Sequence, residues 1–303
     1  MPSDKRQRQR EGRQYRRAQL EAAKRRRTRT RQGAAIGIAI LLVVLIVFLT
    51  NIGGGKKTKV TTSSSTTTTA SASTTAAAGA PPSAPPVTGG GTLKTWACPN
   101  PDGSSAHMSH FPSTPPPTCL NPAKTYTATL TTNQGNIVFT LDTKNTPKTA
   151  NNFAVLSWYH YYDGTSIDRI DTSIDIEQTG SPNTQSISDP GPGYNIPDEP
   201  TFTTDSSGQL HGPYKYAAGD VVMARSSGAN SGSAQYFFVY GSAASALNSQ
   251  GTYVTFGHAD QASQAVLNKI AALYEPCPSG DQTCLGGAPK SVVLISKVTI
   301  TAS

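Results

Sequence analysis

Four cysteines are the residues whose type and spacing most directly suggest chemistry. Cys98 and Cys119 flank a Pro-rich stretch, and Cys277 and Cys284 flank a short loop rich in Gly, Asp and Gln. An even number of cysteines favours disulfides in an exported protein, and four cysteines allow three connectivities. We expect the two pairs that are local in sequence, Cys98–Cys119 and Cys277–Cys284.

A zinc site is the alternative for the first pair. Cys98, His107, His110 and Cys119 have nearly symmetric spacing, and tetrahedral zinc takes such ligands. Their spacing matches no familiar zinc module, and both histidines lie in a Ser/Pro-rich loop where unliganded histidine is the rule. We therefore expect no metal.

Motifs for the commonest enzyme chemistries are missing from the sequence. There is no G-x-S-x-G, no G-x-x-x-x-G-K-[ST] and no H-E-x-x-H, and GPGY at 191–194 lacks the third glycine of a dinucleotide fingerprint. Taken alone, Arg169 is best explained as a surface ion pair with Asp168 or Asp171. No cofactor is expected.

Charge is distributed very unevenly along the 303 residues. Residues 1–32 hold 13 Lys and Arg against 3 Asp and Glu, whereas the rest of the chain holds 13 against 15. The net charge of +8 therefore comes from the N-terminal tail. A phosphate-binding globule would need the excess charge on its folded part, so specific nucleic-acid binding is not expected.

An uncharged apolar segment follows the basic tail. Residues 33–52 are about as long as a bilayer-spanning helix, and no good cleavage site for a signal peptide follows them. Bases crowd the N-terminal side of this segment. We therefore expect a single-pass cell-membrane anchor with residues 1–32 cytoplasmic and the C-terminal part extracytoplasmic. A cleaved signal peptide is the alternative. The tail is expected to fix topology and contact anionic lipid.

The next residues predict a tether and then a folded part. Residues 53–92 are rich in Thr, Ser, Ala, Pro and Gly and lack apolar periodicity, which predicts a disordered, flexible linker. Residues 93–124 form a Pro-rich segment that contains the first two cysteines. A globular domain is expected over 125–303.

Hydrophobic periodicity predicts a mainly β domain. Alternation predicts a hairpin at 126–132 and 137–141 and further strands at 166–170, 174–178, 220–224, 236–240, 254–258 and 292–300. Helical spacing predicts helices at 147–159, capped by Thr146 with Pro147 at its first position, and at 261–273. In the second helix, Ala262, Ala265, Val266, Ile270 and Leu273 form the expected buried face. Many short strands with two helices predict a closed β-barrel capped by the helices.

The order of short motifs is more specific than composition. After the hairpin come TPKTANNF at 146–153, YYDGT at 161–165, DRI at 168–170, QTGSP at 178–182, GPGY at 191–194, MAR at 223–225, AQYF at 234–237 and FG at 256–257. Over residues 125–303 this order and spacing resemble the cyclophilin family of peptidyl-prolyl isomerases. The anchor, tether and cysteine-containing segment are similar to those of membrane-anchored actinobacterial members.

The resemblance implies one groove with two groups of residues. Arg169 would be the catalytic guanidinium and Gln178 its hydrogen-bonding neighbour. The substrate-binding residues would be Ile174 and Ile176 in the proline pocket, Ala224 and Arg225 along the peptide backbone, and Gln235, Phe237, Leu247 and Tyr253. One extra residue between Arg169 and Gln178 leaves the alignment of Ile174 and Ile176 open.

The chemistry implied by the resemblance needs no acid, base or nucleophile. Amide resonance gives rotation about the X–Pro bond a barrier of about 18–20 kcal/mol. A permanently charged guanidinium that donates to the proline nitrogen localises its lone pair and lowers this barrier, while an apolar pocket holds the ring.

Three departures from the family pattern bear on activity. The family's F-H-R reads Ile167-Asp168-Arg169, which adds a carboxylate able to compete for the Arg169 donors. Ile174 replaces a pocket aromatic, and residues 243–251 contain no Trp. Whether catalysis is efficient is therefore open, and tight binding of cyclosporin-type inhibitors is not expected.

Two functions from different classes follow. The leading hypothesis is a monomeric, membrane-tethered isomerase that acts on Pro-containing segments of exported polypeptides while they fold. The alternative is a catalytically weak or inactive cyclophilin-like peptide-binding or chaperone module at the cell envelope. A structural stalk built around the tether is a third interpretation.

Overall fold

The structure is a computed structural model that describes residues 83–226, 228–278 and 284–303. The predicted basic tail at 1–32, the predicted membrane helix at 33–52 and most of the predicted linker lie outside these residues. Within them, no helix is long and apolar enough to cross a bilayer.

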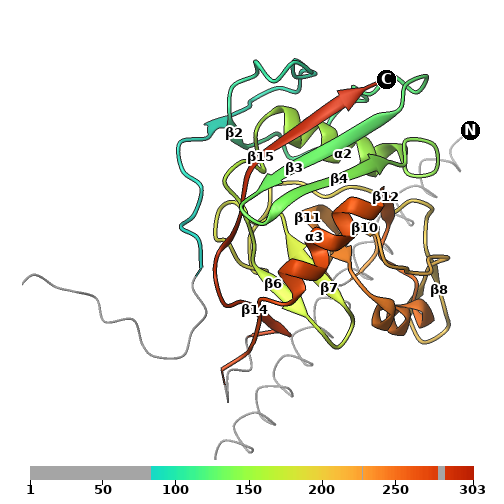
Figure 1. The fold of residues 1–303 in the computed structure, drawn as a ribbon. Helices are drawn as coiled ribbons and strands as arrows, with labels where there is room; N and C mark the ends of the chain where they lie inside the picture. Colours follow the sequence, from blue (N-terminus) through green and yellow to red (C-terminus); the bar gives the residue numbers. More distant parts are fainter. Residues whose placement is uncertain (1–82, 227, 279–283) are drawn as a thin grey trace, which may run out of the picture. The chain divides into compact units, whose positions relative to one another are not determined.

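Most of the described strands form one antiparallel sheet (Figure 1). Its nine strands lie in the order β5 (Ser166–Ile167), β15 (Val293–Ala302), β3 (Tyr126–Thr132), β4 (Gly135–Leu141), β12 (Thr255–Ala259), β10 (Asp220–Arg225), β11 (Gly232–Val239), β7 (Ile176–Thr179) and β6 (Arg169–Asp171). The strands predicted from alternation are present, most with shifted ends, except that the strand predicted at 166–170 is divided at Asp168 into β5 and β6. A mainly β fold is therefore confirmed.

The two edge strands of this sheet are neighbours in the chain. β5 and β6 are separated by a single residue, Asp168, whose N–H donates to the Gln178 carbonyl at 3.1 Å. The sheet therefore curls until its edges nearly meet, which gives a nearly closed barrel and leaves little free edge for unwanted pairing.

Aromatic side chains fill the barrel. Phe153 stacks on Tyr162 with ring centroids 5.2 Å apart, and Tyr236 meets Phe153 edge to face at the same distance. Phe139 and Phe256 complete this group, and all five are at most 1% exposed. Inward residues alternate with outward ones along the strands, so the outer face of the same sheet remains available for a site.

Helix α2 (Pro147–Trp158) closes one end of the barrel and is buried on all sides from Thr149 to Trp158. Thr146 occupies the predicted N-cap position, but its hydroxyl donates to the Asp142 carbonyl and does not cap the helix. Glu199, 51 residues downstream of Lys148, accepts from the N–H groups of Lys148 and Thr149 at 3.0 and 2.7 Å. A buried carboxylate at this position also interacts favourably with the helix dipole.

We expect Glu199→Gln to destabilise the domain by about 2 kcal/mol. The amide keeps one acceptor but turns a donor toward the N–H groups of α2 and loses the charge. Urea unfolding should show a lower midpoint with an unchanged slope. Thr146→Val is the matched control and should cost no more than about 1 kcal/mol, because its hydroxyl satisfies only one carbonyl. An equal loss in both variants would contradict the assignment of Glu199 as the cap.

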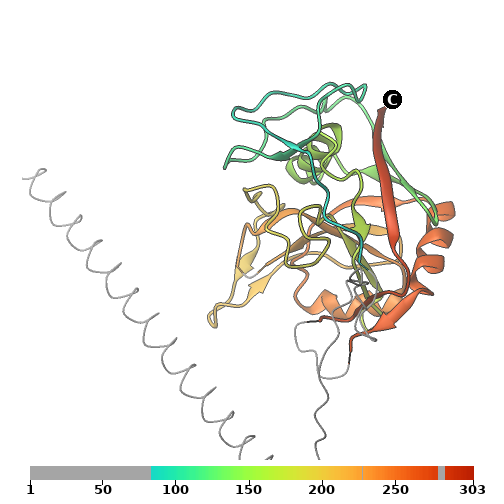
Figure 2. The same ribbon diagram turned by 90° about the vertical axis from the view of Figure 1, so that its left-hand side faces the viewer.

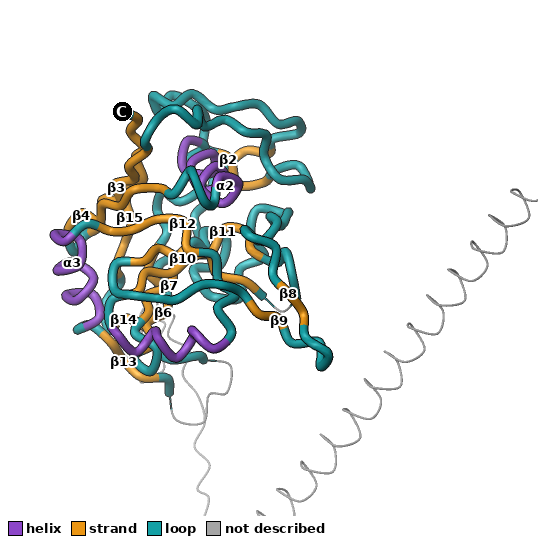
Figure 3. Tube along the Cα trace, turned by 90° about the vertical axis from the view of Figure 1, so that its right-hand side faces the viewer, coloured by secondary structure: helices purple, strands orange, loops and turns teal. Residues whose placement is uncertain are grey.

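Helix α3 (Gln261–Ala271) packs on β4, and Figure 3 shows it against this strand. Its buried residues are Ser263, Leu267 and Ile270. The predicted buried face was right at Ile270, with Val266 and Leu273 packed against the core, but wrong at Ala262 and Ala265, which are exposed. Ser263 explains the difference, because its hydroxyl exchanges hydrogen bonds with the backbone of Val138 in β4 and so turns the helix.

The residues before the barrel fold onto it. β1 (Gly91–Thr92) pairs with β2 (Met108–His110), and Figure 2 shows these residues in teal over the end of the barrel near α2. Trp96 stacks on Phe111 at 5.3 Å, and both rings meet Tyr194 of the barrel domain.

Contacts continue into the described end of the predicted linker. Ala84 is buried, and the Val87 N–H donates to the Pro182 carbonyl at 2.8 Å.

A 3-10 helix and two pairs of short strands complete the fold. The 3-10 helix η1 (Ser242–Ser249) follows β11, and β8 (Thr203–Thr204) pairs with β9 (Leu210–His211). β13 (Tyr274–Pro276) pairs with β14 (Gly287–Pro289), which packs on β6. None of these was predicted; the four strands are runs of two or three residues, which carry no periodicity.

Candidate functional site

A cavity of about 490 Å³ lies against the outer face of the sheet. It is lined by residues from β6, β7, β10, β11 and η1, and by residues from the loops after β7 and around residue 285. Every predicted catalytic and substrate-binding residue lines this cavity: Arg169, Ile174, Ile176, Gln178, Ala224, Arg225, Gln235, Phe237, Leu247 and Tyr253. Residues spread over 85 positions of sequence thus meet in one place.

Arg169 lies on β6 at the edge of the cavity and is held by three hydrogen bonds. Its Nη1 donates to Gln178 Oε1 at 2.9 Å, its Nη2 to Asp171 Oδ2 at 2.6 Å and its Nε to the Leu285 carbonyl at 2.9 Å. Of the five guanidinium N–H donors, three therefore have partners among the described residues. The side chain is 17% exposed, so the two remaining N–H groups can reach a molecule in the cavity.

Two glutamines extend this network along the cavity floor. Gln178 uses its carbonyl oxygen for Arg169 and donates from Nε2 to Gln235 Oε1 at 2.8 Å. Gln235 in turn donates to the Ile187 carbonyl at 3.2 Å. Each amide group thus has its orientation fixed by its neighbour, and the chain of bonds transmits that orientation to the guanidinium.

An apolar cluster forms the other side of the cavity. Ile176, Val222, Phe237, Val239, Ala244 and Tyr216 are buried together outside the barrel, and Ile174, Ala224, Leu247 and Tyr253 pack against them. Tyr253 meets Phe237 edge to face at 5.6 Å. This wall is apolar and partly aromatic, which suits a compact saturated ring.

Arg225 supplies a second guanidinium to the cavity. It donates from Nη1 to Thr252 Oγ1 at 3.2 Å and from Nη2 to the Gly228 carbonyl at 3.0 Å. Asp189 also lines the cavity, but the N–H groups of Thr184 and Gly191 and the amide of Asn183 occupy its oxygens.

The predicted competition between Asp168 and Arg169 was wrong about the partner. Arg169 pairs with Asp171, which lies two residues along β6 and so on the same face of the strand. The Asp168 carboxylate oxygens are buried on the opposite side, where burial raises the pKa of that carboxyl to about 7. The Asp171 pair uses one donor of the guanidinium and orients the others.

We expect Asp168→Asn to remove a loss of stability that the wild type shows as the pH rises toward neutrality. With a folded-state pKa near 7 and an unfolded value near 4, the folded state holds a proton that the unfolded state releases. Stability then falls as the pH rises from about 4 to about 7 and is constant above that. Between pH 5 and 8, urea unfolding should show the wild type losing roughly 2 kcal/mol relative to the variant.

Asp102→Asn is the control for this measurement. The pKa of exposed Asp102 is lowered by hydrogen bonds from Ser104, so this carboxyl is ionised in both the folded and the unfolded state above pH 5, and its removal should leave the pH dependence between pH 5 and 8 unchanged. Parallel stability curves for the wild type and Asp168→Asn would contradict the raised pKa.

The cavity contains residues that the sequence did not suggest. Ile187, Asp189 and Pro190 come from the loop after β7, and Leu285 follows the second disulfide. Leu285 lies 116 residues from Arg169 in sequence and after the last recognisable motif, so only the expected disulfide beside it drew attention to that region.

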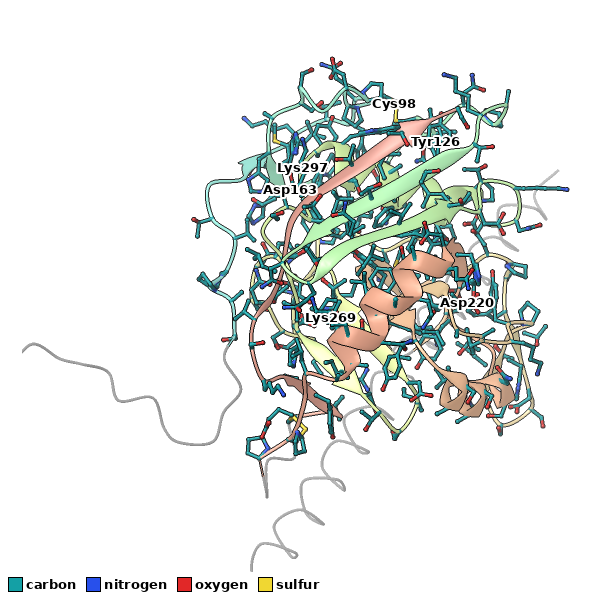
Figure 4. All side chains as sticks on the ribbon, viewed as in Figure 1. Cys98, Tyr126, Asp163, Asp220, Lys269 and Lys297 are labelled. Atoms are coloured by element: carbon teal, nitrogen blue, oxygen red, sulfur yellow. A yellow bond between two sulfur atoms is a disulfide. The ribbon has the colours of Figure 1, made fainter. Side chains whose placement is uncertain are left out.

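Both expected disulfides are confirmed. Cys98 is bonded to Cys119, and Cys277 to Cys284. The two sulfurs that the alternative zinc site would need are therefore bonded to each other. In Figure 4, Cys98 lies at the same end of the domain as Tyr126, the first residue of β3.

Comparison with known proteins matches most of the described domain to one family. A family model described as cyclophilin type peptidyl-prolyl cis-trans isomerase/CLD matches residues 127–300. A probable peptidyl-prolyl cis-trans isomerase B of Mycobacterium leprae is 34% identical over 153 residues, which are 48% of this chain and 49% of that protein. A peptidyl-prolyl cis-trans isomerase of Helicobacter pylori strain J99 is 30% identical over 149 residues, 49% of this chain and 82% of that protein.

A probable peptidyl-prolyl cis-trans isomerase B of Mycobacterium tuberculosis H37Rv is also 34% identical, over 148 residues that form 45% of it. The chain thus spans about half the length of the mycobacterial relatives that it matches.

Two solved structures are similar to part of this chain. A crystal structure of a Cryptosporidium parvum cyclophilin type peptidyl-prolyl cis-trans isomerase covers 59% of this chain and 99% of its own, with 24% identity and a TM-score of 0.45. Its structure in the presence of the dipeptide Ala-Pro covers 58% and 99%, with 25% identity and a TM-score of 0.45. Because the family model matches more than half of the 303 residues, this chain belongs to the cyclophilin-type peptidyl-prolyl cis-trans isomerase family.

Proposed function

We propose that this chain catalyses cis–trans isomerisation of X–Pro bonds in the cavity beside Arg169. The observation that carries the proposal is the guanidinium held by three hydrogen bonds at the border of an apolar wall, with two donors left for a ligand. A cavity of about 490 Å³ has the size of a site for a short peptide segment.

The geometry suits a rotation that needs no proton transfer. The apolar cluster around Phe237 holds the proline ring, while a free N–H of Arg169 donates to the proline nitrogen as the amide twists. The lone pair of that nitrogen is delocalised in the planar amide and localised in the twisted one, so the hydrogen bond is stronger in the transition state. The fixed guanidinium requires no reorganisation during the rotation.

The alternative function, a peptide-binding or chaperone module, differs from an isomerase in its catalytic efficiency. Ile174 provides less surface than an aromatic residue would, and residues 243–251 contribute no Trp. A smaller wall weakens binding of the ring in ground and transition states alike and so raises KM more than it lowers kcat. A peptide-binding module without turnover is the second candidate, and these two features favour it.

We further propose that the domain acts outside the cell membrane as a tethered monomer. The uncharged segment at 33–52 and the bases before it support an anchor with the C-terminal part outside. Both disulfides fit an oxidising compartment. Its substrates would be Pro-containing segments of exported polypeptides, for which uncatalysed isomerisation takes tens of seconds.

The experiment is an NMR exchange measurement on a proline-containing peptide with the purified full-length chain. Wild type should accelerate the exchange, Arg169→Ala should abolish the acceleration, and Lys124→Ala should leave it unchanged because exposed Lys124 lies outside the cavity. Peptide binding without acceleration in the wild type would move the function to the binding module. Acceleration that survives in Arg169→Ala would refute the role of this guanidinium.

A further inference from the structure

The residues that follow the Cys277–Cys284 disulfide lie against the strand that carries Arg169. β14 packs on β6, and Figures 1 and 3 show the two strands side by side. Leu285, just before β14, lines the cavity and is 55% exposed, the only large apolar residue in the described part of the chain that is mostly exposed. An exposed leucine beside a site requires a reason other than core packing.

The main chain of Leu285 contacts the guanidinium directly. Its carbonyl accepts the Nε–H of Arg169 at 2.9 Å, whereas the other two partners, Gln178 and Asp171, lie on strands of the sheet itself. The guanidinium is a rigid planar group, so the Nε–H bond to this carbonyl, together with the Nη1 and Nη2 bonds, fixes the plane of the whole group. The two free N–H groups then point in a defined direction.

Gly286 explains how this carbonyl is held. It has φ +83°, and a Cβ there would lie 2.8 Å from Asp171 Cβ and 3.0 Å from the Ile170 carbonyl. The backbone can therefore approach β6 this closely only as glycine. The Tyr274 hydroxyl donates to the Gly286 carbonyl at 3.0 Å, which ties the same residue to β13.

We propose that Leu285 is a positioning residue, whose carbonyl fixes the guanidinium plane of Arg169 and is itself held by the disulfide-linked pair β13–β14. The proposal deepens the proposed function, because it rests on Arg169 acting on the substrate. It predicts that residues outside the recognisable motifs control the rate.

Gly286→Ala tests the proposal by moving the carbonyl away from β6. We expect kcat to fall about tenfold with KM within about twofold of wild type, because displacement of a catalytic group acts on the rotation step. Gly208→Ala is the matched control: its φ of +85° gives the same backbone strain, but nothing lies within 4 Å of the added Cβ. It should leave the rate unchanged.

The disulfide provides a second, independent variant. Cys277→Ser/Cys284→Ser should lower kcat threefold to tenfold, whereas Cys98→Ser/Cys119→Ser removes the disulfide remote from the cavity and should leave kcat unchanged. Leu285→Ala separates the side chain from the carbonyl. It should raise KM about threefold with little change in kcat, because the carbonyl stays and apolar surface in the cavity is lost.

The readout that does not depend on activity is the ¹⁵N–¹H resonance of Arg169 Nε in the full-length chain. This proton should exchange slowly with water in the wild type and rapidly in Gly286→Ala. Equal exchange in both, or equal rates for Gly286→Ala and Gly208→Ala, would overturn the proposal. If the wild type shows no isomerisation but the Nε proton is protected and loses its protection in Gly286→Ala, the proposed function fails and the positioning by Leu285 stands.

Discussion

Replacing Arg169 with lysine is expected to lower kcat/KM for a proline-containing peptide at least a hundredfold, about 3 kcal/mol, although the charge is kept. The guanidinium satisfies Leu285, Gln178 and Asp171 with one rigid group and still has donors for a ligand. A lysine ammonium has three donors on a flexible stem and cannot reach all these acceptors while pointing into the cavity. The NMR exchange measurement on the full-length chain gives both kcat and KM.

Asp171→Asn is the matched variant for this prediction. It removes the charge of the Arg169 partner but keeps an acceptor at the same place, so the rate should fall less than fivefold if Asp171 orients the guanidinium. An Arg169→Lys variant with more than a fifth of wild-type activity would mean that a point charge is sufficient. The conclusion that catalysis requires a fixed orientation of the Arg169 guanidinium would then be wrong.

A chain that begins at residue 125, the predicted start of the domain, is expected not to fold. The removed residues include Phe111 and Leu120, which are buried, and Trp96, which stacks on Phe111. Loss of their burial costs about 5–8 kcal/mol, which is comparable to the whole stability of a domain. Asn151 would also lose the N–H groups of Cys119 and Leu120 that its side chain accepts.

The control is a chain that begins at residue 83, which keeps these contacts and the docked residues Ala84 and Val87. Near-ultraviolet circular dichroism and thermal unfolding should show a cooperative transition for this chain only. A cooperative transition in the chain from residue 125, within a few degrees of the control, would contradict the role of the N-terminal segment.

Local patterns predicted most of the fold because the information for each element lay within it. Alternation at 126–132 and Pro147 at a helix start are properties of short stretches, and both elements lie where expected. The cap on α2 was missed because Glu199 lies far along the chain. The buried face of α3 was predicted only in part, because Ser263, a polar residue, bonds to β4 and turns Ala262 and Ala265 outward.

The site was predicted better than its internal contacts. The order of the motifs predicted ten site residues, and all ten line one cavity. It could not predict which acidic residue pairs with Arg169. Alternation along β6 would have favoured Asp171 over Asp168, because residues two apart share a face. The Leu285 carbonyl could not be foreseen, since main-chain atoms carry no sequence signal and the contact depends on how the second disulfide region docks on β6.

The junction at Asp168 has a consequence for fluctuations of the domain. Ile167, on one edge strand, pairs with Val293 of β15, and Arg169, on the other, pairs with Gln178 of β7, so parting the sheet edges tilts the strand that carries the guanidinium. Amide hydrogen exchange at Asp168 and Ile167 should therefore slow when a peptide occupies the cavity. We therefore expect a single motion both to open the barrel and to disperse the site.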